Sequence, residues 1–194
     1  MIRYCNRLLH VIPLAAMVIA CAAVADTAVP RHYSAAGTID VAFTPGDRID
    51  RLITGEIDAA RGEVVVLAYS FTDRGIARAL VRAHQRGVQV QVIADREQAR
   101  ALPHNVLQDL VAGGVDVALD GNFQAAHNKV IVIDADAPRA TTITGSYNYT
   151  IAAQRSNAEN VIVLRDNPSV ARAYRENWAR LKAAATPWSD TPRP

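Results

Sequence analysis

The chain has 194 residues, of which 50% are hydrophobic and 21% charged, with 10 glycines and nine prolines. This length and composition exclude a disordered chain and favour one compact domain over two. The 21 Lys and Arg residues against 19 Asp and Glu give a formal net charge of only +2.

The first 25 residues predict a secretory signal peptide. Arg3 and Arg7 form a short positive region, the following run to Val24 is mostly apolar, and Ala23 and Ala25 are the small residues that a signal peptidase reads. The apolar run is short and is interrupted by a histidine and a proline, which disfavours a membrane span. We therefore expect cleavage after Ala25 and an exported protein, either periplasmic or secreted.

A lipoprotein signal is a second interpretation of the same segment. Val18-Ile19-Ala20-Cys21 resembles a lipobox, whose cysteine is acylated and becomes the new N-terminus, so that Cys21 would anchor an envelope lipoprotein. In both interpretations Cys5 is lost, and the mature chain has no disulfide, thiolate zinc site or cysteine nucleophile. Cleavage after residue 25 also removes two arginines and no acids, leaving 19 basic and 19 acidic residues. Bulk charge therefore gives no evidence for a polyanionic partner.

After a linker over residues 26–37, strand patterns alternate with helix patterns. We predict strands at 39–43, 63–70, 88–94, 115–119, 129–134, 141–145 and 161–164. We predict helices capped by Asp47, from Thr72 or Asp73 to Gln85, over 106–112, and from Pro168 onward. This alternation predicts an α/β fold with a mixed sheet and helices on both faces. A single domain over 38–186 and a disordered tail over 187–194 complete the expected organisation.

Four polar side chains follow a common spacing at two predicted strand ends. His127 and Lys129 stand one residue apart at the start of the fifth predicted strand, so both point to the same face. Ser146 and Asn148 have the same spacing just after the sixth. If these strands are neighbours, the four groups converge at one end of the sheet. An imidazole, with a usual pKa near ~6.5, can attack or transfer a proton there, while the other groups bind a phosphate.

Glu159 follows within a short loop and turn, where its carboxylate can hold one ring nitrogen of His127 and leave the other free to attack. Lys129 is one of only two lysines, against 19 arginines, which suggests that a compact ammonium group suits its position. Each residue taken singly has a structural explanation. A lone histidine is more often structural than catalytic, and Asp134 at a strand end is more often a turn former.

The specific signal is the order and spacing of six residues together. They are His127, Lys129, Asp134, Gly145, Ser146 and Asn148. This set resembles the HKD motif of the phospholipase D superfamily. Residues 68–73 and 86–90, with the helix between them, resemble its core strand-helix-strand unit. The length, single motif and export signal most resemble its small EDTA-resistant bacterial endonucleases, the Nuc type, over residues 38–185.

The resemblance implies a metal-independent phosphodiesterase without a cofactor. One histidine attacks phosphorus to form a phosphohistidine, a second protonates the leaving oxygen, and lysines and asparagines stabilise the phosphoryl oxygens. The resemblance implies the following roles: His127 as nucleophile and acid, Lys129 and Asn148 as catalytic phosphate ligands, and Ser146 as an assisting ligand. The position of Glu159 adds the expectation that it orients His127. Asp134 and Gly145 are expected to be structural parts of the motif.

The chain has one such motif, although the implied mechanism uses two histidines. The remaining histidines of the mature chain lie in no comparable setting: His32, His84 and His104. A two-fold homodimer, in which His127 of each subunit faces the other, would supply the second histidine and form one active site per dimer.

Three functions stay open at the level of sequence. The first is a non-specific endonuclease that cleaves DNA, and RNA as a further substrate. The second is a phospholipase D that hydrolyses phospholipid head groups, because the same catalytic set serves both substrates. The third, from another class, is an inactive module that only binds polyanions. Retention of the whole set disfavours the third, since binding alone needs no nucleophile.

Overall fold

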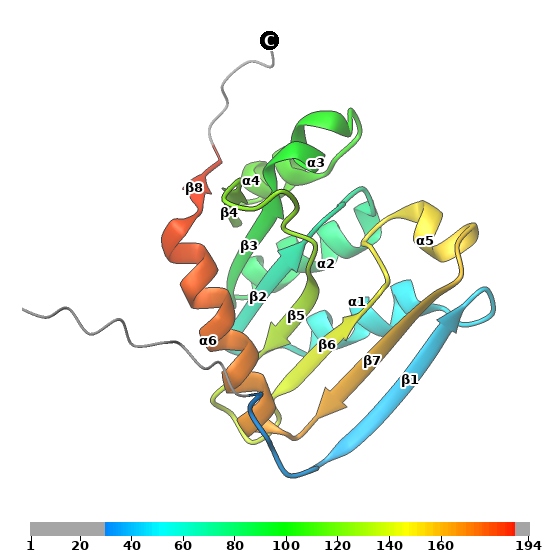
Figure 1. Cartoon of the computed structure of the whole chain (residues 1–194), viewed down its shortest axis with the longest axis vertical. Helices are drawn as coiled ribbons and strands as arrows, with labels where there is room; N and C mark the ends of the chain where they lie inside the picture. The colour runs from blue at the N-terminus through cyan, green and yellow to red at the C-terminus, as the bar shows by residue number, and fades with distance from the viewer. Residues whose placement is uncertain (1–29, 189–194) are drawn as a thin grey trace, which may run out of the picture. The chain divides into compact units, whose positions relative to one another are not determined.

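The computed structural model describes residues 30–188 (Figure 1). The chain divides into residues 1–32 and 33–194, and the fold described here is that of the second unit. The predicted signal peptide, Cys21 and the first part of the linker lie outside the described residues. Residues 30–36 form no helix or strand. Within the described part of the chain, no helix has both the length and the apolar character needed to cross a membrane.

The centre of the fold is one mixed sheet of eight strands, in the order β1-β7-β6-β5-β2-β3-β4-β8. The strands are β1 (Thr38–Thr44), β2 (Glu63–Ala68), β3 (Gln89–Asp95), β4 (Asp116–Asp120), β5 (Lys129–Ile133), β6 (Thr141–Gly145), β7 (Glu159–Arg165) and β8 (Thr186–Pro187). The strands β2, β3 and β4 are parallel, and every other neighbouring pair is antiparallel. The predicted mixed sheet is confirmed.

Helices cover both faces of this sheet. They are α1 (Ile49–Ala59), α2 (Arg74–Gln85), α3 (Arg96–Ala101), α4 (Leu107–Ala112), α5 (Ile151–Arg155) and α6 (Pro168–Ala184). The first five contribute side chains to one core, and α6 packs on the opposite face, in front of the central strands in Figure 1. The α/β fold predicted from the alternating patterns is therefore confirmed.

The continuous apolar run of β2 explains the two cores. Successive side chains of a strand point to opposite faces, so Val64 and Val66 enter the core beneath α1 and α2, whereas Val65 and Leu67 enter the core beneath α6. The indole of Trp178 in α6 donates a hydrogen bond to the Val66 carbonyl oxygen at 3.1 Å. That bond ties the second helical layer to the middle of the sheet.

Two local predictions are wrong. Asp47 does not cap α1, because Arg48 is the residue before the helix and the Asp47 carboxylate accepts from the Phe43 N–H at 2.8 Å, closing the preceding turn. The predicted disorder from residue 187 is also wrong for residues 187 and 188. Pro187 pairs with β4, and the Trp188 N–H donates to the Val117 carbonyl oxygen at 2.8 Å while its ring packs against the core.

Candidate active site

Four strand ends meet at one edge of the sheet. Because β5 is antiparallel to both β2 and β6, and β7 is antiparallel to β6, the ends of β2 and β6 lie beside the beginnings of β5 and β7. The neighbouring positions of β5 and β6 fulfil the condition on which the predicted site depended. The residues gathered at this edge are Tyr69, His127, Lys129, Ser146, Asn148 and Glu159.

His127 and Lys129 are in direct contact. The Lys129 Nζ atom lies 3.1 Å from His127 Nδ1 and donates to the His127 carbonyl oxygen at 3.0 Å. The Lys129 ammonium also lies 4.7 Å from the ring centroid of Tyr69, a cation–π distance. The rings of Tyr69 and His127 are 4.3 Å apart at an angle of 58°. The lysine is buried while the histidine is exposed, so the imidazole is the accessible member of the pair.

Burial lowers the pKa of Lys129 below its usual value of 10.5, and the negative charge of Glu159 opposes that shift. An ammonium group has hydrogen-bond donors and no acceptor, so it can only donate to His127 Nδ1. A neutral imidazole in this contact therefore carries its proton on Nε2. Attack through Nε2 consequently requires Lys129 to leave Nδ1.

Glu159 joins Ser146 in a compact network. The Ser146 hydroxyl donates to Glu159 Oε2 at 2.6 Å and accepts from the Asn160 N–H at 3.0 Å. The side chain of Asn157 donates to the other carboxylate oxygen at 2.9 Å. Among residues 30–188 no hydrogen bond joins Glu159 to His127, so the orienting role of Glu159 stays a prediction. In the structure the Glu159 carboxylate instead fixes the position of the Ser146 hydroxyl.

Asn148 carries a buried amide oxygen, and no described group donates to it. An unsatisfied buried acceptor costs about 1–3 kcal/mol, so this side chain is not explained by stability. The loop that carries it is well anchored, because the Tyr149 carbonyl oxygen accepts from the N–H groups of Thr72 and Asp73, each at 2.9 Å. The amide is thus held in place at the site, where its NH2 group, and not the buried oxygen, is the part that can donate to a phosphate.

Gly145 owes its identity to a close approach between strands. A Cβ atom at this position would collide with the Asn160 carbonyl oxygen and lie 2.9 Å from the Cα atom of Val161. The absence of a side chain lets β6 and β7 stay paired up to the edge where Ser146 meets Glu159.

Comparison with known proteins agrees with this geometry. A family model described as "Cardiolipin synthase, PLD-like domain" matches residues 53–182. The chain belongs to the phospholipase D superfamily. As a member, it is a phosphodiesterase of the hydrolase class.

Relatives within the superfamily carry different names. The chain is 36% identical over 158 residues to a phospholipase D of Rickettsia felis, covering 79% of this chain and 76% of the relative. It is 32% identical over 131 residues to the mitochondrial cardiolipin hydrolase of Xenopus laevis, covering 68% of this chain and 59% of that protein. The crystal structure of Nuc, a phospholipase D family member from Salmonella typhimurium, superposes with a TM-score of 0.73 at 30% identity. That match covers 79% of this chain and 99% of Nuc.

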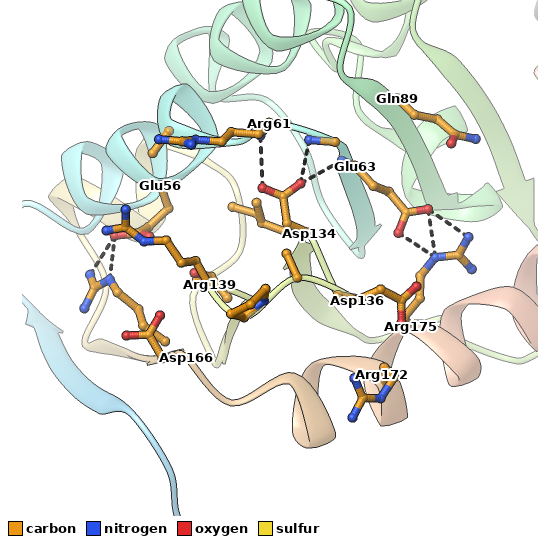
Figure 2. A pocket seen from close by; sticks show the side chains of 18 of the residues that line it. Glu56, Arg61, Glu63, Gln89, Asp134, Asp136, Arg139, Asp166, Arg172 and Arg175 are labelled. Atoms are coloured by element: carbon orange, nitrogen blue, oxygen red, sulfur yellow. Dashed lines mark hydrogen bonds and ion pairs between the residues drawn. The ribbon is translucent and has the colours of Figure 1, made fainter.

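Asp134, the last letter of the superfamily's HKD motif, does not lie beside the histidine. It follows β5 directly, whereas His127 precedes that strand, which separates the two by roughly 20 Å of extended chain. Its carboxylate accepts from the N–H groups of Arg61, Gly62 and Glu63 at 3.0, 2.7 and 2.8 Å (Figure 2). A cavity of about 1200 Å³ opens at this far end, away from the catalytic edge.

The structure adds two elements of the site that sequence reasoning did not assign. Tyr69 lies against both His127 and Lys129, although it was noted only as part of the resembling segment. Asp95 is buried, and its Oδ2 accepts from the Ala126 N–H at 2.8 Å, immediately before His127. An aspartate ending an apolar strand before a helix was a signal for a cap. Only the tertiary structure shows that the same carboxylate holds the histidine loop.

Within residues 30–188, no group of three or more His, Cys, Asp or Glu side chains is arranged to hold a metal ion. Independence from metal stays a prediction that the chelator experiment below tests.

Proposed function

We propose that this superfamily member is an endonuclease that cleaves DNA, with RNA as a further substrate, through a phosphohistidine formed on His127. The observation that carries the proposal is the accessible imidazole in contact with the buried Lys129 ammonium. The choice of nucleic acid rests on the resemblance to the Nuc type. The structural match supports this choice, because it covers 99% of the Nuc chain and 79% of this chain, so the two proteins share nearly the whole of the Nuc fold.

The proposed reaction begins when the substrate phosphate draws Lys129 away from His127 Nδ1. The ammonium then donates to a phosphoryl oxygen, and Asn148 and Ser146 assist. Once Lys129 has left, the imidazole gives its Nε2 proton to solvent and takes a proton from solvent on Nδ1, where Glu159 accepts the N–H. The Nε2 lone pair then forms an N–P bond while the P–O ester bond breaks. A second histidine gives its proton to the leaving oxygen. Water, losing a proton to that histidine, then forms a P–O bond as the P–N bond breaks.

The second histidine is proposed to be His127 of another subunit. His84 lies within α2, and His104, in the turn between α3 and α4, makes no hydrogen bond or ring contact with the catalytic edge among the described residues. One chain therefore supplies one imidazole to the reaction, and a two-fold dimer supplies two.

The decisive experiment compares plasmid DNA cleavage with and without excess chelator. We expect full activity in chelator, loss of at least a thousandfold in His127→Ala, and no change in the exposed control His104→Ala. Strict dependence on Mg²⁺ would contradict the mechanism. Trapping of a phosphorylated peptide containing His127 after a quench in alkaline denaturant, in which the P–N bond is stable, would support the covalent step directly.

A phospholipase D is the second candidate, favoured by the name and 36% identity of the Rickettsia felis relative. Incubation of the same preparation with phosphatidylcholine vesicles distinguishes the two substrates, since head-group release without DNA cleavage would replace the first candidate by the second. Binding to DNA without turnover would instead favour the inactive binding module.

We further propose that the protein is exported. The mass of the mature protein recovered from an expressing bacterium tests this, because cleavage after Ala25 leaves Asp26 as the first residue. An N-terminal acylated Cys21 would instead establish the envelope lipoprotein. The full-length mass in the cytoplasmic fraction would contradict both forms of export.

A further inference from the structure

The ring of Tyr69 contacts both His127 and Lys129. Its centroid lies 4.3 Å from that of the His127 ring and 4.7 Å from the Lys129 ammonium nitrogen. The imidazole itself is exposed, and its other side-chain contact is with the same ammonium, which lies 3.1 Å from Nδ1. The proposed nucleophile and its neighbouring cation therefore share one aromatic neighbour.

The backbone of Tyr69 is anchored on both sides. Ala68, directly before it, is buried and is paired with Lys129 in the ladder between β2 and β5. Phe71, two residues after it, is also buried and forms an isolated bridge with Tyr149. The register of the sheet thus places the residue after β2 against the start of β5. The Tyr69 ring is held there by a segment that does not depend on the position of the Lys129 ammonium.

The proposed reaction requires that ammonium to move. Lys129 must leave His127 Nδ1 before Nε2 can attack, and it must keep its charge until it reaches the phosphate. A hydrogen bond weakens steeply when the donor turns away from the acceptor. The negative face of an aromatic ring, in contrast, attracts a cation anywhere within about 6 Å of the centroid. Once Lys129 has left Nδ1, the ring of Tyr69 remains in contact with the exposed imidazole.

We propose that Tyr69 is a positioning residue, which holds the Lys129 ammonium and the His127 ring while Lys129 moves from the imidazole to the substrate phosphate. The inference rests on the proposed function, in which this movement precedes attack. The ring supplies the effect, since it is the ring that makes both contacts.

The same contact favours the charged form of Lys129, because the ring face attracts an ammonium more strongly than a neutral amine. The other titratable groups beside Lys129 are His127, in the loop before β5, and Glu159, at the start of β7. Weakening of the ring face should therefore lower the pKa of Lys129 when these two groups are left unchanged.

The first measurement is the pKa of Lys129, which requires no activity. The chain has only two lysines, so protein labelled with carbon-13 at lysine Cε gives two signals in a pH titration followed by NMR. Lys182 is the internal control, because it pairs with Asp116 at the start of β4, at the opposite end of the sheet from the catalytic edge. Tyr69→Phe keeps the ring. Replacement of Tyr69 by trifluorophenylalanine keeps its approximate size but withdraws the negative charge from its face.

We expect Tyr69→Phe to leave the pKa of Lys129 unchanged and the fluorinated ring to lower it, with Lys182 the same in both. The second measurement is kcat/KM for a nitrophenyl phosphodiester. It should stay near wild type in Tyr69→Phe and fall roughly 2–30-fold with the fluorinated ring, the range set by loss of a cation–π contact. The alkaline limb should then begin at lower pH. Unchanged melting by circular dichroism shows that the variants remain folded.

The outcomes separate Tyr69 from the proposed function. Equal pKa values of Lys129, together with equal kcat/KM, in Tyr69→Phe and in the fluorinated protein overturn the positioning role. A loss of kcat/KM in Tyr69→Phe as large as that in Tyr69→Leu, which removes the ring, assigns the effect to the hydroxyl and also overturns it. A wild type that cleaves neither plasmid DNA nor the phosphodiester overturns the proposed function, while the pKa of Lys129 still decides whether the ring holds the ammonium.

Discussion

The Lys129 ammonium is subject to two opposing effects. Burial lowers its pKa from 10.5, and Glu159 raises it. Phosphate binding needs the charged form, so kcat/KM should fall as pH rises through the pKa of Lys129. This fall should begin at a lower pH than it would for an exposed lysine. Glu159→Gln removes the raising charge and should move the alkaline limb to still lower pH. Measurement of kcat/KM on plasmid DNA against pH tests this, and identical limbs in both proteins would contradict it.

Asp95 is expected to position the histidine without touching substrate. Its Oδ1 accepts from the Gln98 N–H and its Oδ2 from the Ala126 N–H, both at 2.8 Å. Asp95→Asn places an amide N–H against one of these donors, so the loop before His127 should loosen. We expect kcat to fall by roughly 10–100-fold with little change in KM, as positioning errors do. The exposed control Asp109→Asn should leave both unchanged. A rise in KM of roughly 10–100-fold with kcat unchanged would instead indicate that Asp95 acts in substrate binding.

The connection between α1 and β2 depends on a single carboxylate. Asp134 adopts φ +50°, a conformation that Asp and Asn tolerate better than most residues, and accepts from three consecutive N–H groups. Asp134→Ala leaves these donors without their acceptor and should lower the free energy of unfolding by roughly 2–3 kcal/mol. Urea unfolding measures this.

Asp134→Asn is the matched variant, because it keeps one acceptor oxygen and tolerance of the same backbone conformation. We expect it to lose less stability than Asp134→Ala. In both variants kcat at a temperature well below unfolding should stay near wild type, since the carboxylate lies at the far end of β5. A large loss of kcat in fully folded Asp134→Asn would give this residue a catalytic role.

At the scale of the whole molecule, the shared site predicts that a dimer with one inactive subunit has no activity. If each active site uses His127 from both subunits, exchange of wild type with an equal amount of His127→Ala should leave about a quarter of the activity of all-wild-type protein. Independent subunits would retain about half. Cleavage rates after re-equilibration of dilute mixtures measure this, with mixtures that are not allowed to exchange as the control.

The order of the elements was predictable from local pattern. Apolar periodicity and caps act within a few residues, and they located most strands and four of the six helices. The short helices α3 and α5 were not predicted, because five or six residues span too few turns to show a period. The equally short α4 was predicted because Gly113 and Gly114 mark its end. The superfamily could also be predicted from the sequence, because the spacing of His127 and Lys129, and that of Ser146 and Asn148, does not depend on the fold.

The tertiary structure decided which groups touch. Tyr69 contacts His127, and Asp95 accepts from the Ala126 N–H next to it, because the sheet places β2 beside β5 and β3 beside β2, an order that no local pattern specifies. The sequence by itself determined which residues carry the proposed chemistry and which short segments form helices or strands. Long-range strand pairing determined their contacts.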